Sequence, residues 1–259
     1  MARFNRDNIR YNAPIFDFDE INPEVDYSNY TFNYKEIKPY ILNKSFSACI
    51  KLYKKEFFDK YDDFYFDTGL IFEDVSFHVK VMLRATKISY VPEYLYFYRQ
   101  NPNSIINTNK NREDIYKVIN IVEKFLKENN YYNEFKYEFD YFKVLQILQY
   151  ILEANTEEYF NKAKDEFSSM DLNNNDLIYP KYIDLFNIVL DSNSFAEFKL
   201  SYYRFEIKRL SVENEILEKR LDNLKEKNNY LNNEKNLILK SKSWKITKLL
   251  RMIKHIFKK

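Results

Sequence analysis

Residues 66–84 read F-D-T-G-L-I-F-E-D-V-S-F-H-V-K-V-M-L-R, an acidic turn followed by a run of mostly apolar residues. We predict that a helix begins at Asp74 and ends near Ala85. Its apolar side chains recur at helical spacing: Val75, Val79, Met82 and Leu83. Asp74 can cap this helix, which is worth about 1 kcal/mol, or it can act as a base if it lies beside a cleft. His78 comes one turn later, where we favour packing or a place on the helix surface over a ligand role.

The sequence on either side of this helix is mixed in character. Residues 1–40 are polar and rich in Asn and Asp, which predicts irregular structure with short strands. Two aromatic and β-branched runs follow the helix, K-I-S-Y-V at 87–91 and Y-L-Y-F-Y at 94–98. Each run is typical of a short strand. We therefore predict an α/β segment over residues 1–108.

Residues 109–193 have a helical pattern. Apolar residues at helical spacing mark one helix over 115–126 and another over 139–152. Thr156 can begin a third helix, and residues 182–190 predict a fourth. The mixed segment is thus followed by a purely helical one.

Residues 194–239 predict one long helix that carries a coiled-coil repeat. Ser194 and Glu197 form a capping-box pattern at its start. Apolar residues recur every seven positions at Leu210, Leu217, Leu224, Leu231 and Ile238. The companion core positions, three residues earlier, hold Ile207, Asn214, Leu221, Asn228 and Lys235. This spacing predicts a coiled coil of about four heptads.

The core and the flanking positions of this repeat favour different partners. The two Asn residues favour a parallel dimer, because an Asn that faces an apolar residue leaves its amide unsatisfied. In a parallel homodimer, however, Glu213 would face Glu218 and Arg220 would face Lys225, and each like-charged pair costs a few tenths of a kcal/mol. The helix could instead pack on the preceding helices, bind a different protein, or stand alone.

Residues 240–259 predict a basic amphipathic tail helix. Its apolar face includes Trp244, and its other face carries Lys245, Lys248, Arg251 and Lys254. Each cation near an anionic leaflet contributes about 1 kcal/mol, so the tail could hold the protein on a membrane without crossing it. The alternative is a terminal helix that docks on the body of the protein and leaves its basic face in solvent.

Composition excludes several kinds of site from these 259 residues. The single glycine, Gly69, leaves neither a Gly-rich dinucleotide fingerprint nor a P-loop. The single cysteine excludes an intramolecular disulfide and a multi-cysteine zinc site. The tail holds seven Lys, one Arg and no acid, so residues 1–239 carry a net charge of −6 against +2 for the whole chain. An acidic body argues against a nucleic-acid partner.

Three blocks of sequence together resemble the second half of the catalytic domain of family 2 glycosyltransferases, which have the GT-A fold. They are K-L-Y-K-K-E-F-F at 51–58, F-D-T-G-L-I-F-E-D-V-S-F at 66–77, and K-I-S-Y-V-P-E-Y-L-Y-F-Y-R-Q-N-P-N-S-I at 87–105. The tail segment S-K-S-W-K-I-T-K-L-L-R is also similar to the terminal segment of many such bacterial enzymes. The resemblance implies inverting transfer of a sugar from a nucleotide-sugar donor to a glycan or lipid-linked acceptor of the cell surface.

The resemblance also implies roles for particular residues. Asp74 would be the base that deprotonates the acceptor hydroxyl, and Glu73 would orient the acceptor or support that base. Arg99, Ser104 and Lys51 would lie near the diphosphate of the donor, where cations and hydroxyls can stabilise the charge of the leaving group.

Enzymes of this family bind the nucleotide through a preceding half that ends in an Asp-x-Asp motif, which holds a divalent metal, Mg²⁺ or Mn²⁺. We expect this half to be missing, because Asp17-Phe18-Asp19 matches the letters of the motif but not its spacing to Asp74. The chain is then truncated, a piece of a split enzyme with a nucleotide-binding partner, or degenerate. We expect it to be cytoplasmic and peripheral on the inner face of the membrane. The alternative function is that of a non-catalytic scaffold, which tethers a partner through its coiled coil and tail.

Overall fold

The chain divides into two compact units, Met1–Leu200 and Ser201–Lys259. The structure is a computed structural model, and the residues it describes are 2–5, 8–11, 30–43, 46–91, 93, 95–99, 111–172, 175–244 and 247.

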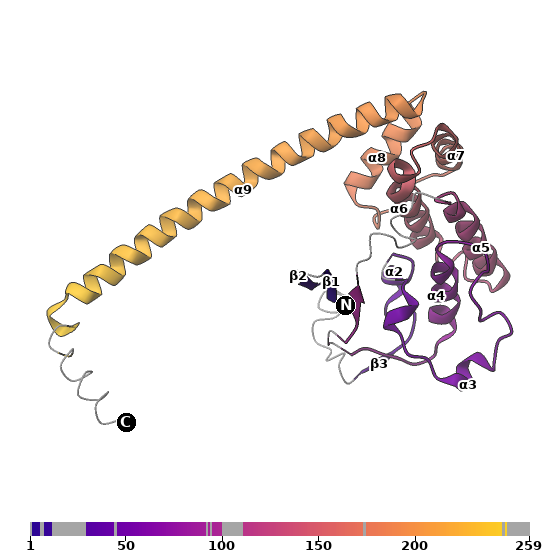
Figure 1. Ribbon diagram of the computed structural model, residues 1–259, viewed down its shortest axis with the longest axis horizontal. Coiled ribbons are helices and arrows are strands. Elements are labelled where there is room, and N and C mark those ends of the chain that lie inside the picture. The colour runs from indigo at the N-terminus through magenta and orange to yellow at the C-terminus, as the bar shows by residue number, and fades with distance from the viewer. Residues whose placement is uncertain are drawn as a thin grey trace. The chain divides into compact units, whose positions relative to one another are not determined.

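The described part of the first unit is built around five helices (Figure 1): α4 (Glu73–Arg84), α5 (Asp114–Glu128), α6 (Lys136–Ala154), α7 (Glu157–Ser168) and α8 (Pro180–Asp191). Helix α4 packs on α5 and α5 packs on α6, while α6, α7 and α8 contact one another. The four helices expected over residues 109–193 are thus confirmed, with ends within a few residues of those that the apolar spacing predicted.

The strands are short and form two small sheets. Strand β1 (Ala2–Asn5) pairs antiparallel with β2 (Asn8–Tyr11) and parallel with β5 (Phe97–Arg99). Strands β3 (Thr31–Phe32) and β4 (Ile88–Ser89) form an antiparallel pair of two residues each. The described residues of this part also include three short helical turns: α2 (Lys38–Ile41), η1 (Ala48–Ile50) and α3 (Lys55–Phe58). The described residues are mostly helical, with far less sheet than we expected from an α/β segment.

The core of the first unit lies between its helices and is rich in aromatic rings. On α5 the apolar positions that predicted the helix are buried: Ile115, Val118, Ile119, Val122 and Leu126. On α6, Phe142 is fully buried and its ring meets that of Phe46, with centroids 5.9 Å apart. The amphipathic spacing in the sequence therefore marked the face that packs.

Side-chain caps begin α7 and the last helix, α9 (Phe195–Lys240). The Oγ1 atom of Thr156 accepts a hydrogen bond from the backbone N–H of Tyr159 at 3.1 Å. The Oγ atom of Ser194 accepts one from the N–H of Glu197 at 3.2 Å, while the Glu197 carboxylate accepts from the N–H of Asn193 at 2.8 Å. The capping-box prediction for Ser194 is confirmed in its first half, and α9 begins at the next residue.

Phe142→Ala should lower the free energy of unfolding of the first unit by about 3–5 kcal/mol, because it leaves a cavity between rings that cannot close fully. The measurement is urea unfolding followed by near-ultraviolet circular dichroism. Tyr137→Ala on the same helix is the control, since that side chain is 53% exposed and should change stability little. Equal losses in the two variants would contradict this placement of the core.

Candidate functional site

The turn before α4 has an unusual backbone conformation. Gly69 has a φ of +79° and Phe72, the residue before the helix, has a φ of 69° in the left-handed region. Glycine adopts such angles freely, whereas a bulky residue such as Phe does so only when its surroundings hold it there. The predicted cap is wrong in detail, because α4 begins at Glu73 and has no side-chain cap, and Asp74 lies inside the first turn.

Contacts from α5 and α6 hold this turn in place. The backbone N–H of Ile71 donates to Oδ2 of Asp114 at 3.2 Å, 43 residues along the chain. The Phe72 ring lies on the Tyr150 ring, with centroids 4.6 Å apart and planes at 35°. The Arg112 guanidinium lies 5.8 Å from the Phe72 ring and 5.3 Å from the Tyr150 ring. Tertiary contacts thus fix where Glu73 and Asp74 enter the helix.

The Asp74 carboxyl is partly buried, and its environment disfavours the charged form. Burial raises the pKa of Asp74, and the nearby Glu73 carboxylate raises it further. Lys51 and the backbone N–H of Asp74 act in the opposite direction and lower this pKa. A carboxyl with a raised pKa at the start of a helix accepts a proton more readily than an exposed aspartate, which is the property required of a general base.

Lys51 and Tyr53 share this environment with Asp74. Burial lowers the pKa of Lys51 to about 8, although the Asp74 carboxylate partly opposes that change. The Nζ atom of Lys51 donates a hydrogen bond to the backbone oxygen of Ser47 at 2.7 Å. Burial and the Asp74 charge together raise the pKa of Tyr53 to about 12, so its phenol stays protonated at neutral pH. We call Lys51, Tyr53, Glu73 and Asp74 the carboxylate cluster.

Tyr150 and Arg112 lie beside the carboxylate cluster. Burial raises the pKa of Tyr150 to about 12, with a smaller lowering by Arg112 and a raising influence of Asp74. The Arg112 guanidinium is buried and forms an ion pair of 2.9 Å with Glu153. Arg112 was not singled out from the sequence, because it falls just before the apolar pattern that predicted α5 and has no part in its spacing.

His78 lies inside the core, one turn after Asp74. It is 1% exposed, and its Nε2 atom lies 3.1 Å from the backbone oxygen of Ile41. Burial lowers the pKa of His78 to about 3, so the imidazole is neutral. Its edge meets the Phe46 ring at a centroid distance of 5.3 Å. Of the two settings expected for His78, packing and the helix surface, the structure shows packing.

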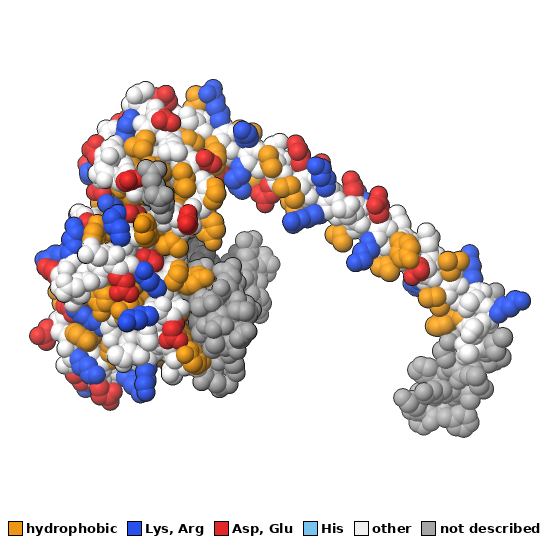
Figure 2. Space-filling view, turned by 180° about the vertical axis from the view of Figure 1, so that it is seen from behind, with side chains coloured by type: hydrophobic (Ala, Val, Ile, Leu, Met, Phe, Trp, Pro, Cys, Tyr) orange, Lys and Arg blue, Asp and Glu red, His pale blue; other side chains and the backbone are white. Residues whose placement is uncertain are grey.

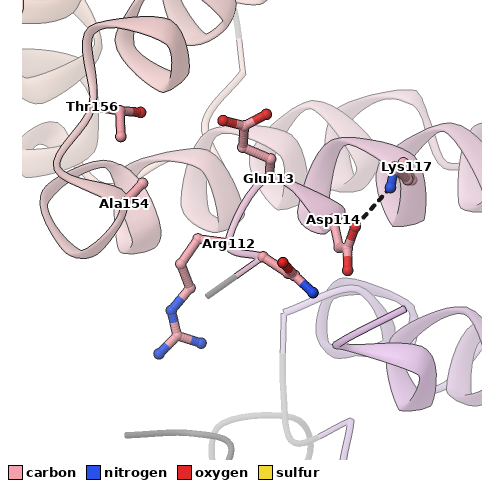
Figure 3. Close-up of a pocket in the computed structure, with 7 residues that line it drawn as sticks. Arg112, Glu113, Asp114, Lys117, Ala154 and Thr156 are labelled. Atoms are coloured by element: carbon pink, nitrogen blue, oxygen red, sulfur yellow. Dashed lines mark hydrogen bonds and ion pairs between the residues drawn. The ribbon is translucent and has the colours of Figure 1, made fainter. Parts of the chain in front are cut away.

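A hollow of about 290 Å³ opens beside this region, between the start of α5 and the loop that joins α6 to α7 (Figure 3). It is lined by Asn111, Arg112, Glu113, Asp114, Lys117, Ala154 and Thr156. Within it the Asp114 carboxylate is turned toward Lys117 and pairs with it at 2.8 Å. Neither Glu73 nor Asp74 lines this hollow, so it is not the acceptor cleft that we expected the acid pair to border.

The structure brings together three of the residues singled out from the sequence: Lys51, Glu73 and Asp74. Arg99 is the last residue of β5 and pairs through its backbone register with Phe4 of β1, but its side chain is outside the description. Trp244 follows the end of α9 and is 38% exposed. Five further positions lie outside the described residues: Ser104, Lys245, Lys248, Arg251 and Lys254.

The described residues offer no group of three or more His, Cys, Asp or Glu side chains that could hold a metal ion. Asp17 and Asp19, which carry the letters of the expected metal motif, lie outside them. The expectation of Mg²⁺ or Mn²⁺ therefore comes only from the resemblance, and no donor set on these elements supports it.

Two substitutions should move the pKa of Asp74 in opposite directions. Lys51→Met removes a neighbouring cation and should raise this pKa, whereas Glu73→Gln removes a neighbouring anion and should lower it. The measurement is a pH titration of the Asp74 carboxyl by carbon-13 NMR. Lys60→Met, which removes an exposed lysine of the same segment, should leave the titration unchanged. Shifts of the same sign in the first two variants would show that the cluster is not arranged as described.

No family model, curated protein or solved structure matches the chain.

Proposed function

We propose that the chain provides the acceptor side of an inverting glycosyltransferase that resembles family 2, with Asp74 as the general base. The observation that carries this proposal is the state of the Asp74 carboxyl, which is partly buried at the start of α4, has a raised pKa and has Lys51 nearby. A GT-A-like arrangement of the first 108 residues belongs to the same proposal, and its support is the order of the three sequence blocks.

Inverting sugar transfer requires a general base for the acceptor hydroxyl and a group that stabilises the charge of the leaving diphosphate. Asp74 takes the proton of an acceptor hydroxyl while that oxygen attacks the anomeric carbon of a nucleotide sugar. The bond between this carbon and the diphosphate breaks, and the nucleoside diphosphate leaves from the opposite face, so the configuration is inverted. Glu73 orients the acceptor, and its charge keeps the pKa of Asp74 high.

Lys51 is the best-supported candidate for contact with the donor. At pH 7 a lysine with a pKa of about 8 is still mostly protonated, so it can face the negative charge that develops on the diphosphate. Arg99 and Ser104 remain in this proposal through the resemblance alone. No step is assigned to a metal ion, because the described residues offer no set of ligands for one.

The remaining parts of the proposal concern location and partners. The donor would be bound by a nucleotide-binding partner chain or domain, and the acceptor would be a glycan or a lipid-linked glycan at the inner face of the membrane. Within the described residues, no helix combines the length and the apolar content needed to span a bilayer. The basic tail supports contact with the membrane surface.

Asp74→Asn should abolish sugar transfer and leave the fold intact, because the amide cannot accept the proton; general-base catalysis is typically worth 10²–10⁴-fold in rate. The assay follows labelled sugar from a panel of nucleotide sugars into lipid-linked product, in membranes where the chain is co-expressed with its neighbouring reading frames. Asp62→Asn is the matched control, since this exposed carboxylate belongs to the same acidic stretch and should not affect transfer. Full transfer by Asp74→Asn with unchanged circular dichroism would exclude Asp74 as the base.

A second function is favoured by the surface of α9, which exposes apolar side chains along its length (Figure 2). An enzyme that only transfers sugar has no need of this surface, whereas a scaffold needs it to hold a partner. In this alternative the chain binds a partner through the coiled coil and is attached to the membrane by its tail. The two functions are compatible, because a transferase can also be tethered.

We expect the affinity for anionic vesicles, measured by co-sedimentation, to fall about 10³-fold when four tail cations are replaced by Gln: Lys245, Lys248, Arg251 and Lys254. Each cation near such a surface contributes about 1 kcal/mol. Binding to neutral phosphatidylcholine vesicles should be weak for every form of the chain. The matched control removes four exposed lysines from the first unit, Lys35, Lys60, Lys124 and Lys181. Equal losses from both sets would mean that the tail is not the site of membrane contact.

A further inference from the structure

The second unit presents a stripe of exposed apolar side chains along one helix. From Leu210 to the end of α9 at Lys240, every residue is exposed. The stripe consists of the seven apolar core positions of the heptad repeat, each between 48% and 69% exposed: Ile207, Leu210, Leu217, Leu221, Leu224, Leu231 and Ile238. The stripe covers 32 residues and, at about 1.5 Å per residue, is about 48 Å long. Single exposed apolar residues are normal on a protein surface, but a patch of this length indicates an interaction site.

We infer that the stripe is the seam of a parallel, in-register coiled coil between two copies of this chain. Three residues on the seam are polar, Asn214, Asn228 and Lys235. The two Asn residues carry this inference, and it does not depend on the sugar-transfer proposal. In a parallel dimer with aligned ends each Asn meets its own counterpart, so each amide can donate to the other and accept from it. No Asn then faces a leucine.

Other alignments of two copies place these amides against apolar side chains. An antiparallel pair with full overlap sets Asn214 opposite Leu231 and Asn228 opposite Leu217. A parallel pair shifted by one heptad sets Asn214 opposite Leu221. A shift of two heptads matches Asn214 with Asn228 but leaves about half of the stripe uncovered. Parallel alignment in register is the arrangement that covers the whole stripe and satisfies both amides.

The charges beside the seam are less unfavourable than the sequence indicated. In the parallel dimer Glu213 faces Glu218 of the other copy, but Glu213 already pairs with Arg209 on its own helix at 3.2 Å. The other pair of like charge is Arg220 with Lys225. There the Nζ atom of Lys225 lies 2.9 Å from the Asp222 carboxylate of its own helix. One member of each pair is thus partly neutralised within its own helix.

Reversing one helix does not remove the repulsion. In the antiparallel pair with full overlap, Glu213 would face Glu234 and Arg220 would face Lys227, so two contacts of like charge remain. The reversal gains one contact of opposite charge, Glu218 with Lys225, at a partly exposed position where such a contact is weak. The antiparallel pair also places both Asn amides opposite leucine. The gain of one ion pair therefore does not make it more favourable than the parallel dimer.

The orientation can be tested with a single cysteine in the full-length chain. Cys49 is exposed and is first replaced by Ser so that it cannot cross-link. Leu210→Cys then places one thiol at a seam position near the beginning of the stripe. In the parallel dimer the two thiols are adjacent and mild oxidation should link most of the protein as a dimer, whereas in the antiparallel pair they are about 37 Å apart. A monomeric product after oxidation would overturn the proposal.

The role of the amides can be tested separately by the oligomeric state. Light scattering at micromolar concentration should give twice the mass of one chain for the wild type. Asn214→Leu with Asn228→Leu should yield larger assemblies or mixed orientations in the cysteine assay, because the element that selects two aligned strands is gone. Asn223→Leu with Asn233→Leu is the matched control, since these exposed positions lie off the seam and the dimer should persist.

Two other results would overturn the proposal. A wild-type chain that stays monomeric until a different protein is added would show that the seam belongs to a heterotypic partner. A dimer that survives Leu217→Asp with Leu224→Asp would show that the two copies meet elsewhere. The near-ultraviolet circular dichroism of the first unit should be unchanged in that variant, which separates loss of the seam from loss of the fold.

Discussion

The turn from Gly69 to Phe72 is the constraint on which the first unit depends. It leads into α4 and contains two residues of positive φ, one of which is a phenylalanine. Such a backbone costs about 1–3 kcal/mol, and here the Asp114 hydrogen bond and the contact of the Phe72 ring with the tilted Tyr150 ring offset it. These contacts come from α5 and α6, so the start of α4 is held by the helical part of the chain. The position of Glu73 and Asp74 is a consequence of that packing.

Aromatic rings and carboxylates together surround two arginine side chains of the first unit. The chain holds 24 Tyr and 23 Phe, and several of its cations lie over their faces. Arg84, on α4, lies 4.4 Å from the Tyr61 ring and 4.8 Å from the Phe125 ring, while its guanidinium also meets Asp63 at 2.5 Å. Arg112 is held in a similar way between rings and Glu153. A cation on a ring stays partly stabilised when water is excluded, which lets charged groups lie close to the apolar core.

Features that depend on residues close together in the sequence could be predicted, whereas features that depend on contacts between distant residues could not. The helices over 109–193 were predictable because their apolar spacing is local, and Thr156 capped α7 as its residue type indicated. The two aromatic runs after α4 have strand propensity, but a strand also needs a neighbour, and β4 pairs over only two residues. No local pattern reveals that Asp114 bonds to the backbone of Ile71, so the left-handed turn in front of α4 could not be predicted.

The same distinction applies to the candidate site. Lys51 and Asp74 were singled out through a family resemblance and not through spacing, because 22 residues, including the short helix α3, lie between them. Arg112 could not be predicted as part of the site, because no sequence pattern marks a charged residue as buried. Which side chains of the site are buried depends on the fold, so this could be seen only in the structure.

The placement of tryptophan gives the second unit a spectroscopic label of its own. The chain contains one tryptophan, Trp244, which follows α9 by four residues and belongs to Ser201–Lys259. Indole emission therefore arises from that place alone, whatever happens among the many phenols of the first unit. Changes in its wavelength report on the polarity around the beginning of the tail, and the phenol region of the circular dichroism spectrum reports mainly on the other unit. Structural changes in the two units can thus be measured separately in one sample without any added dye.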